Sequence, residues 1–368
     1  MKKTATLLAG LLLVTGTVFA ANWDVTTATV EGDIYLLSTE NGSLGTSAGD
    51  LNFKLEAVKS GDFGTLTTTI AVDKASEDQT AINFAYEKTE GDFTIGIGAD
   101  VATTDGAGKT ATWAFKTNES SDAYIAWNVM GSETVKFTYY PYEVDGMSWD
   151  NDTWESFAQT SDPGFALDLT LSENTTVTTK VAVANGDSNT KNSYTAKLEL
   201  STVVAGASVS AAVGASSYNG LDGNTKSSTY TGLSTDKNTM LVAASVSKDL
   251  TDAVSVSAEY NMEKVEDTDA LTGIYVYGSV DLEEVNGYKP TAYAALTLLN
   301  DMAAEYDKDD SNGAFTEVEV GLDMAQGNIT VTPYVVFDSR EEKAYSKEDS
   351  TDTSKTATTV AVSLSYSF

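Results

Sequence analysis

Carboxylates are the side chains that could do chemistry in this sequence, because the other usual candidates are missing. The 368 residues include 54 Asp and Glu against 22 Lys and Arg, with no histidine and no cysteine. Histidine-dependent triads, cysteine nucleophiles and histidine or thiolate metal sites are therefore excluded. The formal net charge of −32 opposes binding to nucleic-acid phosphates, so we expect no nucleic-acid partner.

One acidic segment has the composition of a calcium loop. It is DKDDSNG, residues Asp307–Gly313. When Gly313 takes the place of the turn glycine at the sixth loop position, Lys308 occupies the first position, which needs an oxygen ligand. We therefore predict no EF-hand, no metal centre and no cofactor, while loose calcium binding by an exposed acidic loop stays open.

The elements that carry the carboxylates are predicted to be β-strands with one apolar and one polar face. In residues 254–263, for example, apolar side chains fall on the even positions, and serine, asparagine and glutamate fall on the odd ones. Comparable runs of about 8 to 13 residues recur along the chain and match the length of a tilted membrane strand. Acidic residues at the polar positions are Glu31, Asp33, Glu56, Asp100, Asp168, Glu199, Glu259, Glu263, Asp281, Glu317, Glu319 and Asp323.

The whole pattern predicts an all-β fold, a transmembrane antiparallel β-barrel of about 18 strands, with 16 as the next choice. Connections alternate between short ones and long polar ones such as 219–237 and 338–355, which is typical of such barrels. Nineteen candidate strands can be counted, and because single-chain bacterial barrels have even numbers, one assignment is wrong. We expect the error in 110–140, where NESS and MGSE follow one another, or in 22–37. A secreted soluble β-sandwich or solenoid is the alternative.

The first twenty residues have the features of a secretory signal peptide. MKKTATLLAGLLLVTGTVFA contains two lysines, an apolar run too short to cross a bilayer, and small residues at Val18 and Ala20. We predict cleavage after Ala20, which leaves residues 21–368 as one outer-membrane barrel domain. Loss of Lys2 and Lys3 leaves 20 basic and 54 acidic residues, a formal net charge of −34.

The C-terminus is an alternating strand that ends on an aromatic residue. Val360, Val362, Leu364, Tyr366 and Phe368 share one face of VAVSLSYSF. Together with the signal peptide, this ending resembles bacterial outer-membrane porins. The resemblance implies that Tyr366 and Phe368 are an assembly signal, that the barrel-assembly machinery is a partner, and that a homotrimer can form. Because an open sheet edge cannot exist in lipid, we expect the last strand to pair with the first, around 28–36.

The predicted function is passive diffusion of ions and small hydrophilic solutes through a water-filled, cation-preferring channel in the outer membrane. The twelve carboxylates above would line the pore, with Lys54, Lys136, Lys180 and Lys197 as the few inward lysines, and rings of carboxylates favour cations. A pair such as Glu317 and Glu319 is more typical of such a wall than of a hydrolase site. A sugar-selective variant would use Tyr275, Tyr277 and Tyr293 as a stacking track. The alternative is a non-conducting barrel that acts as an adhesin or structural protein through its loops, and an enzyme ranks last.

The longest connection, 141–163, is predicted to be a constriction loop. Its candidate residues are Asp150, Asp152, Trp154 and Glu155. Asp152 and Glu155 have capping-box spacing, and Trp154, Phe157 and Ala158 have helical spacing, so a short helical turn is expected. The loop either folds inward to narrow the pore, as the resemblance implies, or anchors a surface loop through its tryptophans.

Overall fold

The structure is a computed structural model that describes residues 24–38, 47–73, 79–104, 112–116, 123–131, 134–141, 149–151, 154–157, 163–184, 193–217, 238–266, 270–300, 314–342 and 353–367. Its strands are β1 (Asp24–Ser38), β2 (Ser47–Gly61), β3 (Gly64–Asp73), β4 (Gln79–Glu90), β5 (Phe93–Thr104), β6 (Thr112–Lys116), β7 (Tyr124–Asn128), β8 (Val135–Tyr140), β9 (Trp149–Asn151), β10 (Trp154–Phe157), β11 (Gly164–Ser172), β12 (Thr175–Ala184), β13 (Ser193–Val204), β14 (Ala207–Ser217), β15 (Asn238–Thr251), β16 (Val254–Val265), β17 (Leu271–Asp281), β18 (Lys289–Leu299), β19 (Phe315–Gln326), β20 (Ile329–Glu342) and β21 (Thr353–Ser367). One short 3₁₀ turn, η1 (Val129–Gly131), precedes β8. Among the residues described, no helix is long and apolar enough to cross a membrane.

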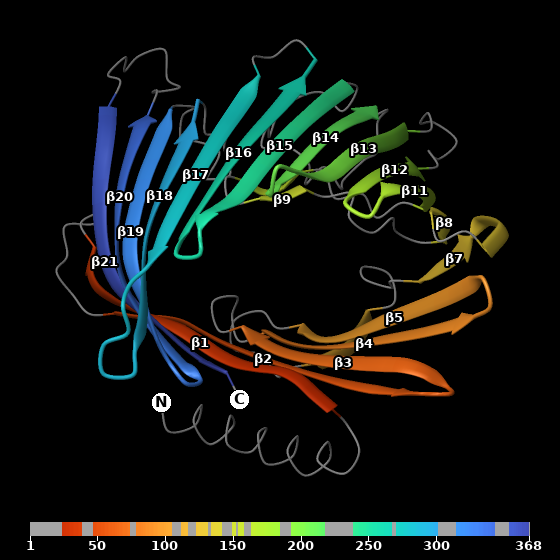
Figure 1. The fold of residues 1–368 in the computed structure, drawn as a ribbon, viewed down its shortest axis with the longest axis horizontal. Coiled ribbons are helices and arrows are strands. Elements are labelled where there is room, and N and C mark those ends of the chain that lie inside the picture. Colours follow the sequence, from red (N-terminus) through yellow and green to blue (C-terminus); the bar gives the residue numbers. More distant parts are fainter. Residues whose placement is uncertain are drawn as a thin grey trace.

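The sheet closes on itself through its first and last strands. Each strand of the barrel pairs antiparallel with its neighbours, and β1 pairs with both β2 and β21. The β1–β21 ladder runs from Thr29 opposite Ser367 to Ser38 opposite Thr359. The predicted pairing of the C-terminal strand with the N-terminal one is therefore confirmed, and Figure 1 shows the resulting ring of strands.

Nineteen strands occupy eighteen positions around this barrel. β6 and β7 both pair with β5: β6 lies along Asp100–Thr104, and β7 along Phe93–Gly96. The two segments are thus one interrupted strand between β5 and β8. The 18-strand prediction is confirmed, and the error in the count of nineteen lies where it was expected. The segments on the two sides of NESS (118–121), which itself lies outside the described residues, run in the same direction along β5.

The connections differ in length between the two ends of the barrel. At one end the β2–β3, β4–β5, β11–β12, β13–β14, β15–β16 and β19–β20 turns contain two residues each, and the β7–β8 and β17–β18 connections contain six and seven. The connections at the other end run from 5 residues between β3 and β4 to 23 between β8 and β11, a segment that contains β9 and β10. Because the number of positions is even, the N-terminal end of β1 and the C-terminal end of β21 both lie at the short-turn end. This distribution is that of bacterial outer-membrane barrels.

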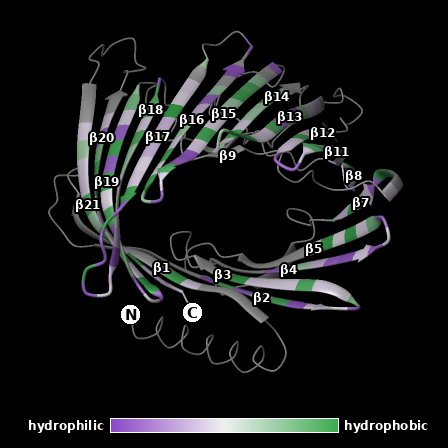
Figure 2. Cartoon of the chain, in the orientation of Figure 1, coloured by the Kyte–Doolittle hydropathy of each residue, from purple (hydrophilic) through white to green (hydrophobic). Residues whose placement is uncertain are grey.

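The register of the ladders divides every strand between two continuous faces. Around β13, β14, β15 and β16, one row joins Leu198, Val213, Val242 and Met262, and the next joins Glu199, Ala212, Ala243 and Asn261. We call these the apolar face and the polar face. Each row stays on the same face from strand to strand around the ring, and Figure 2 shows the resulting alternation of hydropathy along the strands.

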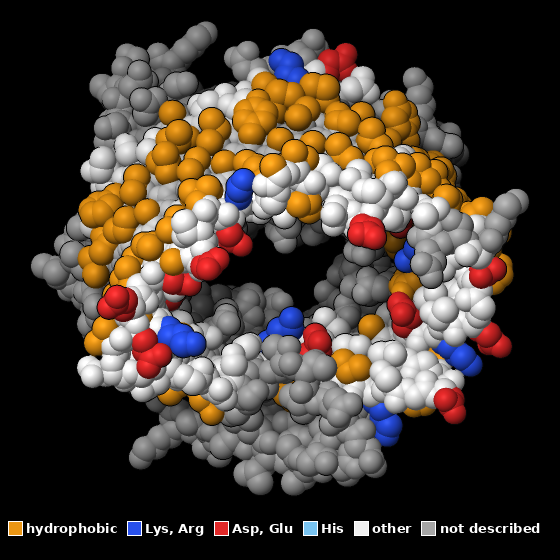
Figure 3. All heavy atoms as spheres, viewed as in Figure 1, with side chains coloured by type: hydrophobic (Ala, Val, Ile, Leu, Met, Phe, Trp, Pro, Cys, Tyr) orange, Lys and Arg blue, Asp and Glu red, His pale blue; other side chains and the backbone are white. Residues whose placement is uncertain are grey.

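Large apolar side chains are exposed on the apolar face. They form a band that includes Ile97, Leu198, Val213, Val246, Ile274, Val320 and Leu364. Exposed aromatic residues flank the band: Phe93, Trp127 and Tyr366 toward the short turns, and Tyr139, Phe165, Tyr194 and Phe337 toward the long connections. Figure 3 shows hydrophobic side chains spread over the outer surface of the barrel. An apolar band between aromatic girdles is the surface of a membrane-spanning barrel.

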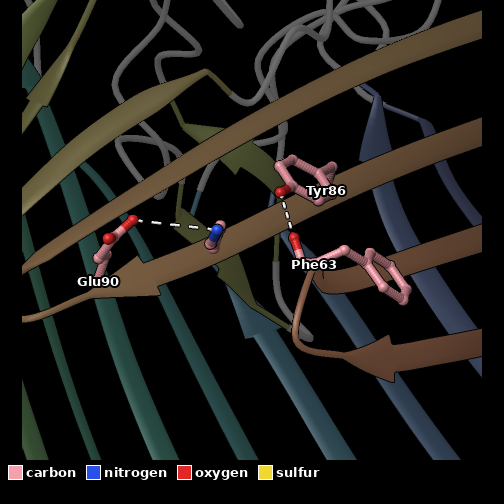
Figure 4. Close-up of polar contacts among 4 residues, drawn as sticks. Phe63, Tyr86 and Glu90 are labelled. Atoms are coloured by element: carbon pink, nitrogen blue, oxygen red, sulfur yellow. Dashed lines mark hydrogen bonds and ion pairs between the residues drawn. The ribbon is translucent and has the colours of Figure 1, made fainter.

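Polar groups on the apolar face near the short turns make contacts there. The Tyr86 hydroxyl donates a hydrogen bond to the Phe63 carbonyl in the β2–β3 turn (2.5 Å), and Lys88 Nζ lies 3.9 Å from a Glu90 carboxylate oxygen (Figure 4). Likewise Lys248 Nζ donates to the Ala205 carbonyl of the β13–β14 turn (2.9 Å). Long side chains of this kind place their charge beyond an apolar surface and cover that surface with their methylenes.

Arginine substitutions at two adjacent residues of β14 test the assignment of faces. Val213→Arg places a charge in the middle of the apolar face and should lower the free energy of unfolding in lipid by about 2 to 4 kcal/mol. Ala212→Arg lies opposite Glu199 on the polar face and should cost little. Urea unfolding of the refolded barrel in vesicles, followed by tryptophan fluorescence, measures both. Equal losses at the two positions would contradict the assignment.

Candidate pore

All twelve carboxylates predicted to line a pore occupy polar-face positions of the ladders. They are distributed as Glu31 and Asp33 on β1, Glu56 on β2, Asp100 on β5, Asp168 on β11, Glu199 on β13, Glu259 and Glu263 on β16, Asp281 on β17, and Glu317, Glu319 and Asp323 on β19. Figure 3 shows acidic and basic side chains around the rim of the central opening. The strands therefore carry these residues on one face of the sheet.

Six acidic residues of β16 to β20 form a cluster on the polar face, which we call the acidic sector. It comprises Glu259, Asp281, Glu317, Glu319, Asp323 and Asp338. One row of the ladder joins Glu259, Tyr275, Thr297, Glu317 and Asp338, and the next row joins Tyr277, Ala295 and Glu319. Within the described ranges, no group of acidic residues is placed to hold a metal ion.

Hydroxyl groups hold several carboxylates of the acidic sector in place. Tyr293 donates a hydrogen bond to Glu319 and Thr332 donates one to Asp323, both at 2.6 Å. Thr291 donates one to Asp281 at 2.7 Å. Each contact joins neighbouring strands, and each supplies a donor to a carboxylate oxygen. Hydrogen bonds to a carboxylate are short and directional, so these donors fix the positions of the three side chains.

The lysines of the polar face lie mainly on other strands. Lys54, Lys136, Lys180 and Lys197 belong to β2, β8, β12 and β13. Lys197 makes a 3.0 Å ion pair with Glu199, and Lys136 lies opposite Asp168. Among the ladder positions described between Glu259 and Asp338, the polar face has one lysine, Lys289, at the short-turn end of β18. The wall therefore has a strongly acidic side and a side of mixed charge.

Two tyrosines of the polar face lie across glycines of neighbouring strands. The ring of Tyr293 covers Gly321, where a Cβ atom would come within 2.4 Å of it. The ring of Tyr124 covers Gly96 in the same way, and its hydroxyl donates to Glu87. The Tyr293 ring also stacks on Tyr277, with centroids 5.9 Å apart and an angle of 26° between the planes.

Sequence reasoning placed Tyr277 and Tyr293 on this face but missed the contacts of Tyr293 with Glu319 and Gly321. A glycine inside a predicted strand was the available signal, because such a position often marks close approach of another group.

The predicted helical turn in the constriction loop is wrong. Trp154 and Glu155 lie in β10, which pairs antiparallel with β9, the strand that contains Asp150. Trp154 lies opposite Asn151, and Phe157 lies opposite Trp149. The backbone pairing of the two short strands decides here over the local helix-start signal. Asp152 lies outside the described residues, so inward folding of the loop stays a prediction.

The remaining predicted features lie at the ends of the chain or in its connections. Tyr366 is on the apolar face, opposite Val30 of β1 and Ile329 of β20. Phe368, the predicted signal peptide (1–20) and the acidic segment 307–313 are outside the residues that the structure describes. An assembly role for Tyr366 is therefore compatible with its place in the closing strand and stays a prediction.

No protein-family model and no curated protein matches this sequence. Solved structures match over nearly its whole length. OprB of Pseudomonas putida is 12% identical, with 96% of each chain covered and a TM-score of 0.50. OccK10 of Pseudomonas aeruginosa is 10% identical, with 93% of this chain and 98% of that chain covered and a TM-score of 0.50. The chain folds as a porin-like barrel. The outer membrane channel DcaP of Acinetobacter baumannii is also similar (13% identity, 95% and 98% coverage, TM-score 0.49).

Cysteine labelling tests which face of the barrel meets water. Because the sequence has no cysteine, single variants give an unambiguous readout. Ala243→Cys on the polar face of β15 should react with a charged, membrane-impermeant thiol reagent, and Val242→Cys on the apolar face should not. Labelling is measured by mass spectrometry on intact outer membranes. Faster labelling at 242 than at 243 would contradict the assignment.

Proposed function

We propose that this protein is a channel of the bacterial outer membrane for passive diffusion of ions and small hydrophilic solutes. The observation that carries the proposal is the closed ring of eighteen strand positions, with an exposed apolar band on one face and carboxylates on the other. Barrels of 16 to 18 strands leave room for an aqueous channel. The proposed activity is diffusion and involves no chemical reaction.

The proposal includes a preference for cations. Its support is the excess of carboxylates at polar-face positions and the hydroxyl donors that hold Glu319, Asp323 and Asp281. Carboxylates along a pore raise the local concentration of cations and oppose anions. The single arginine of the sequence, Arg340, leaves no arginine cluster to balance them.

Export and assembly complete the proposal. Residues 1–20 would direct the chain out of the cytoplasm and be removed after Ala20, and 21–368 would form the barrel. The barrel-assembly machinery would read the last strand through Tyr366 and Phe368. Outer-membrane lipid would contact the apolar face, and a homotrimer is the proposed assembly. An adhesin without conductance is the competing function, and its loops would carry the activity.

Ion selectivity can be measured with the purified barrel in a planar bilayer. In a potassium chloride gradient, the reversal potential should have the sign of potassium preference. The preference should weaken between about 0.01 M and 1 M salt, as the Debye length falls from about 30 Å to about 3 Å. Glu259, Glu263, Glu317 and Glu319 replaced together by glutamine should move the reversal potential toward zero.

A matched variant controls for general effects on the pore. Glu90 lies at the β4–β5 turn and is exposed, so Glu90→Gln should leave the reversal potential unchanged. A wild-type preference for chloride would contradict the cation proposal while leaving the channel intact. Absence of any conductance would contradict the channel itself and favour the adhesin.

The terminal strand can be tested separately from conduction. Replacement of Tyr366 and Phe368 by serine should leave export to the periplasm intact but sharply reduce the amount of folded protein in the outer membrane. Heat-modifiable migration of the barrel in gels measures folding, and cell fractionation measures export. Ile274→Ser, which changes an exposed apolar residue of β17 far from the terminus, is the control and should leave the yield of folded protein unchanged. Normal yield of the terminal variant would exclude an assembly signal there.

A further inference from the structure

A stacked pair of tyrosines stands on the polar face in the middle of the acidic sector. Tyr277 of β17 and Tyr293 of β18 have ring centroids 5.9 Å apart. Both side chains are partly exposed. Apart from Tyr275, the neighbouring polar-face positions of their strands carry small or hydroxyl residues, such as Ser279, Thr291 and Ala295. The pair is therefore an aromatic surface in a polar wall.

The position of the Tyr293 ring is fixed from two directions. The ring covers Gly321, and its hydroxyl donates a hydrogen bond of 2.6 Å to the Glu319 carboxylate. Any larger residue at 321 would need the space that the ring occupies, since a Cβ there would approach the ring to 2.4 Å. The ring is thus held against the wall, and the stack with Tyr277 is a preformed feature of it.

Carboxylates surround this aromatic pair. Glu319 occupies the same row as Tyr277, two strands away, which is about 10 Å between backbones. Glu317 and Asp323 flank that row on β19, and Asp281 lies on β17 four residues from Tyr277. The described polar-face position with a lysine nearest to this region is Lys289, at the end of β18. Aromatic faces and anionic groups therefore occur together.

This combination suits a cation that also has an apolar surface. A cation over a tyrosine ring is attracted by the negative face of the ring within about 6 Å of its centroid, and recognition of quaternary ammonium groups relies on such rings. Potassium gains less, because it retains a tightly held hydration shell. A neutral sugar could stack on the rings but would gain nothing from the net negative charge.

We propose that Tyr277, Tyr293 and the carboxylates around them form a binding subsite for organic ammonium cations on the channel wall. This inference rests on the proposed function, because it needs the polar face to line the conducting path. It adds a chemical class of solute that general cation preference does not specify.

Block of potassium current by choline tests the subsite. The full-length purified protein is placed in a planar bilayer with potassium chloride, and choline chloride is added in increasing concentration. Tyr277→Leu and Tyr293→Leu should each raise the half-blocking concentration of choline about two- to five-fold, the effect of removing one exposed cation–π contact. Tyr293→Phe keeps the ring and should keep the block.

Two glycine variants provide a matched control. Gly321→Ala should displace the Tyr293 ring and weaken choline block as Tyr293→Leu does. Gly96→Ala should displace Tyr124 in the same manner, but β5 and β7 lie on the other side of the barrel (Figure 1), so the block should be unchanged. Heat-modifiable migration confirms that each variant is folded. 3,3-Dimethylbutanol, a neutral analogue of choline, should not block.

Each other outcome has a definite meaning. Equal effects of Gly321→Ala and Gly96→Ala, or equal block by choline and its neutral analogue, would overturn the subsite while the channel remains. Block by glucose that is lost with the tyrosines, without block by choline, would replace it with a sugar subsite. Absence of wild-type conductance would overturn the proposed function and the subsite together.

Discussion

The hydrogen bonding of the backbone is the constraint on which this structure depends. An apolar band surrounds the sheet, and no water is present at that depth in a membrane to satisfy unpaired amide and carbonyl groups. The ladder between β1 and β21 removes the two edges that an open sheet of eighteen positions would have. Once the sheet is closed, its two faces are fixed as the outer and inner surfaces of a ring, and the alternation of side chains acquires a meaning for every strand.

Much of this arrangement could be predicted because a strand has a side-chain period of two. That period assigned Glu259 and Glu319 to one face and Val320 and Leu364 to the other, and the ladders agree. It could not show which segments are neighbours. Residues 112–116 and 124–128 each read as a strand, yet both pair with β5, and only the demand for an even number indicated that one assignment was wrong.

Contacts between strands were the part of the site that the sequence did not reveal. The hydrogen bond from Tyr293 to Glu319 and the ring over Gly321 depend on the register between β18 and β19. That register depends on all the pairings around the barrel, so the spacing of residues within one strand cannot predict it. The error at Trp154 has a different origin. β9 and β10 are separated by only two residues, so the hairpin is as local as the capping-box spacing, and that spacing indicated the wrong one of two local structures.

Charged and aromatic side chains are unevenly distributed over the polar face of the barrel, because they belong to different strands. Carboxylates, hydroxyl donors and two stacked tyrosines gather on β16 to β20, while Lys136, Lys180 and Lys197 lie on β8, β12 and β13. Charges of opposite sign on distant strands do not cancel locally, because attraction between exposed charges is screened beyond a Debye length of about 8 Å at physiological ionic strength. In the proposed channel, a solute would therefore meet different surroundings according to the strands it passes.

The pairing of Thr29 with Ser367 also determines the order in which the molecule can form. Most neighbouring strands at the short-turn end are joined by two residues and can meet early as hairpins, but the seam joins segments from opposite ends of the chain. The entropy of closing a loop grows only with the logarithm of its length, so equilibrium stability hardly suffers from this separation. The separation instead affects the kinetics of folding. Until β21 emerges, β1 remains an unpaired edge with an apolar face, which is the kind of surface that aggregates. Aggregation of such a chain with other unfolded chains has to be prevented until its last strand can pair with β1.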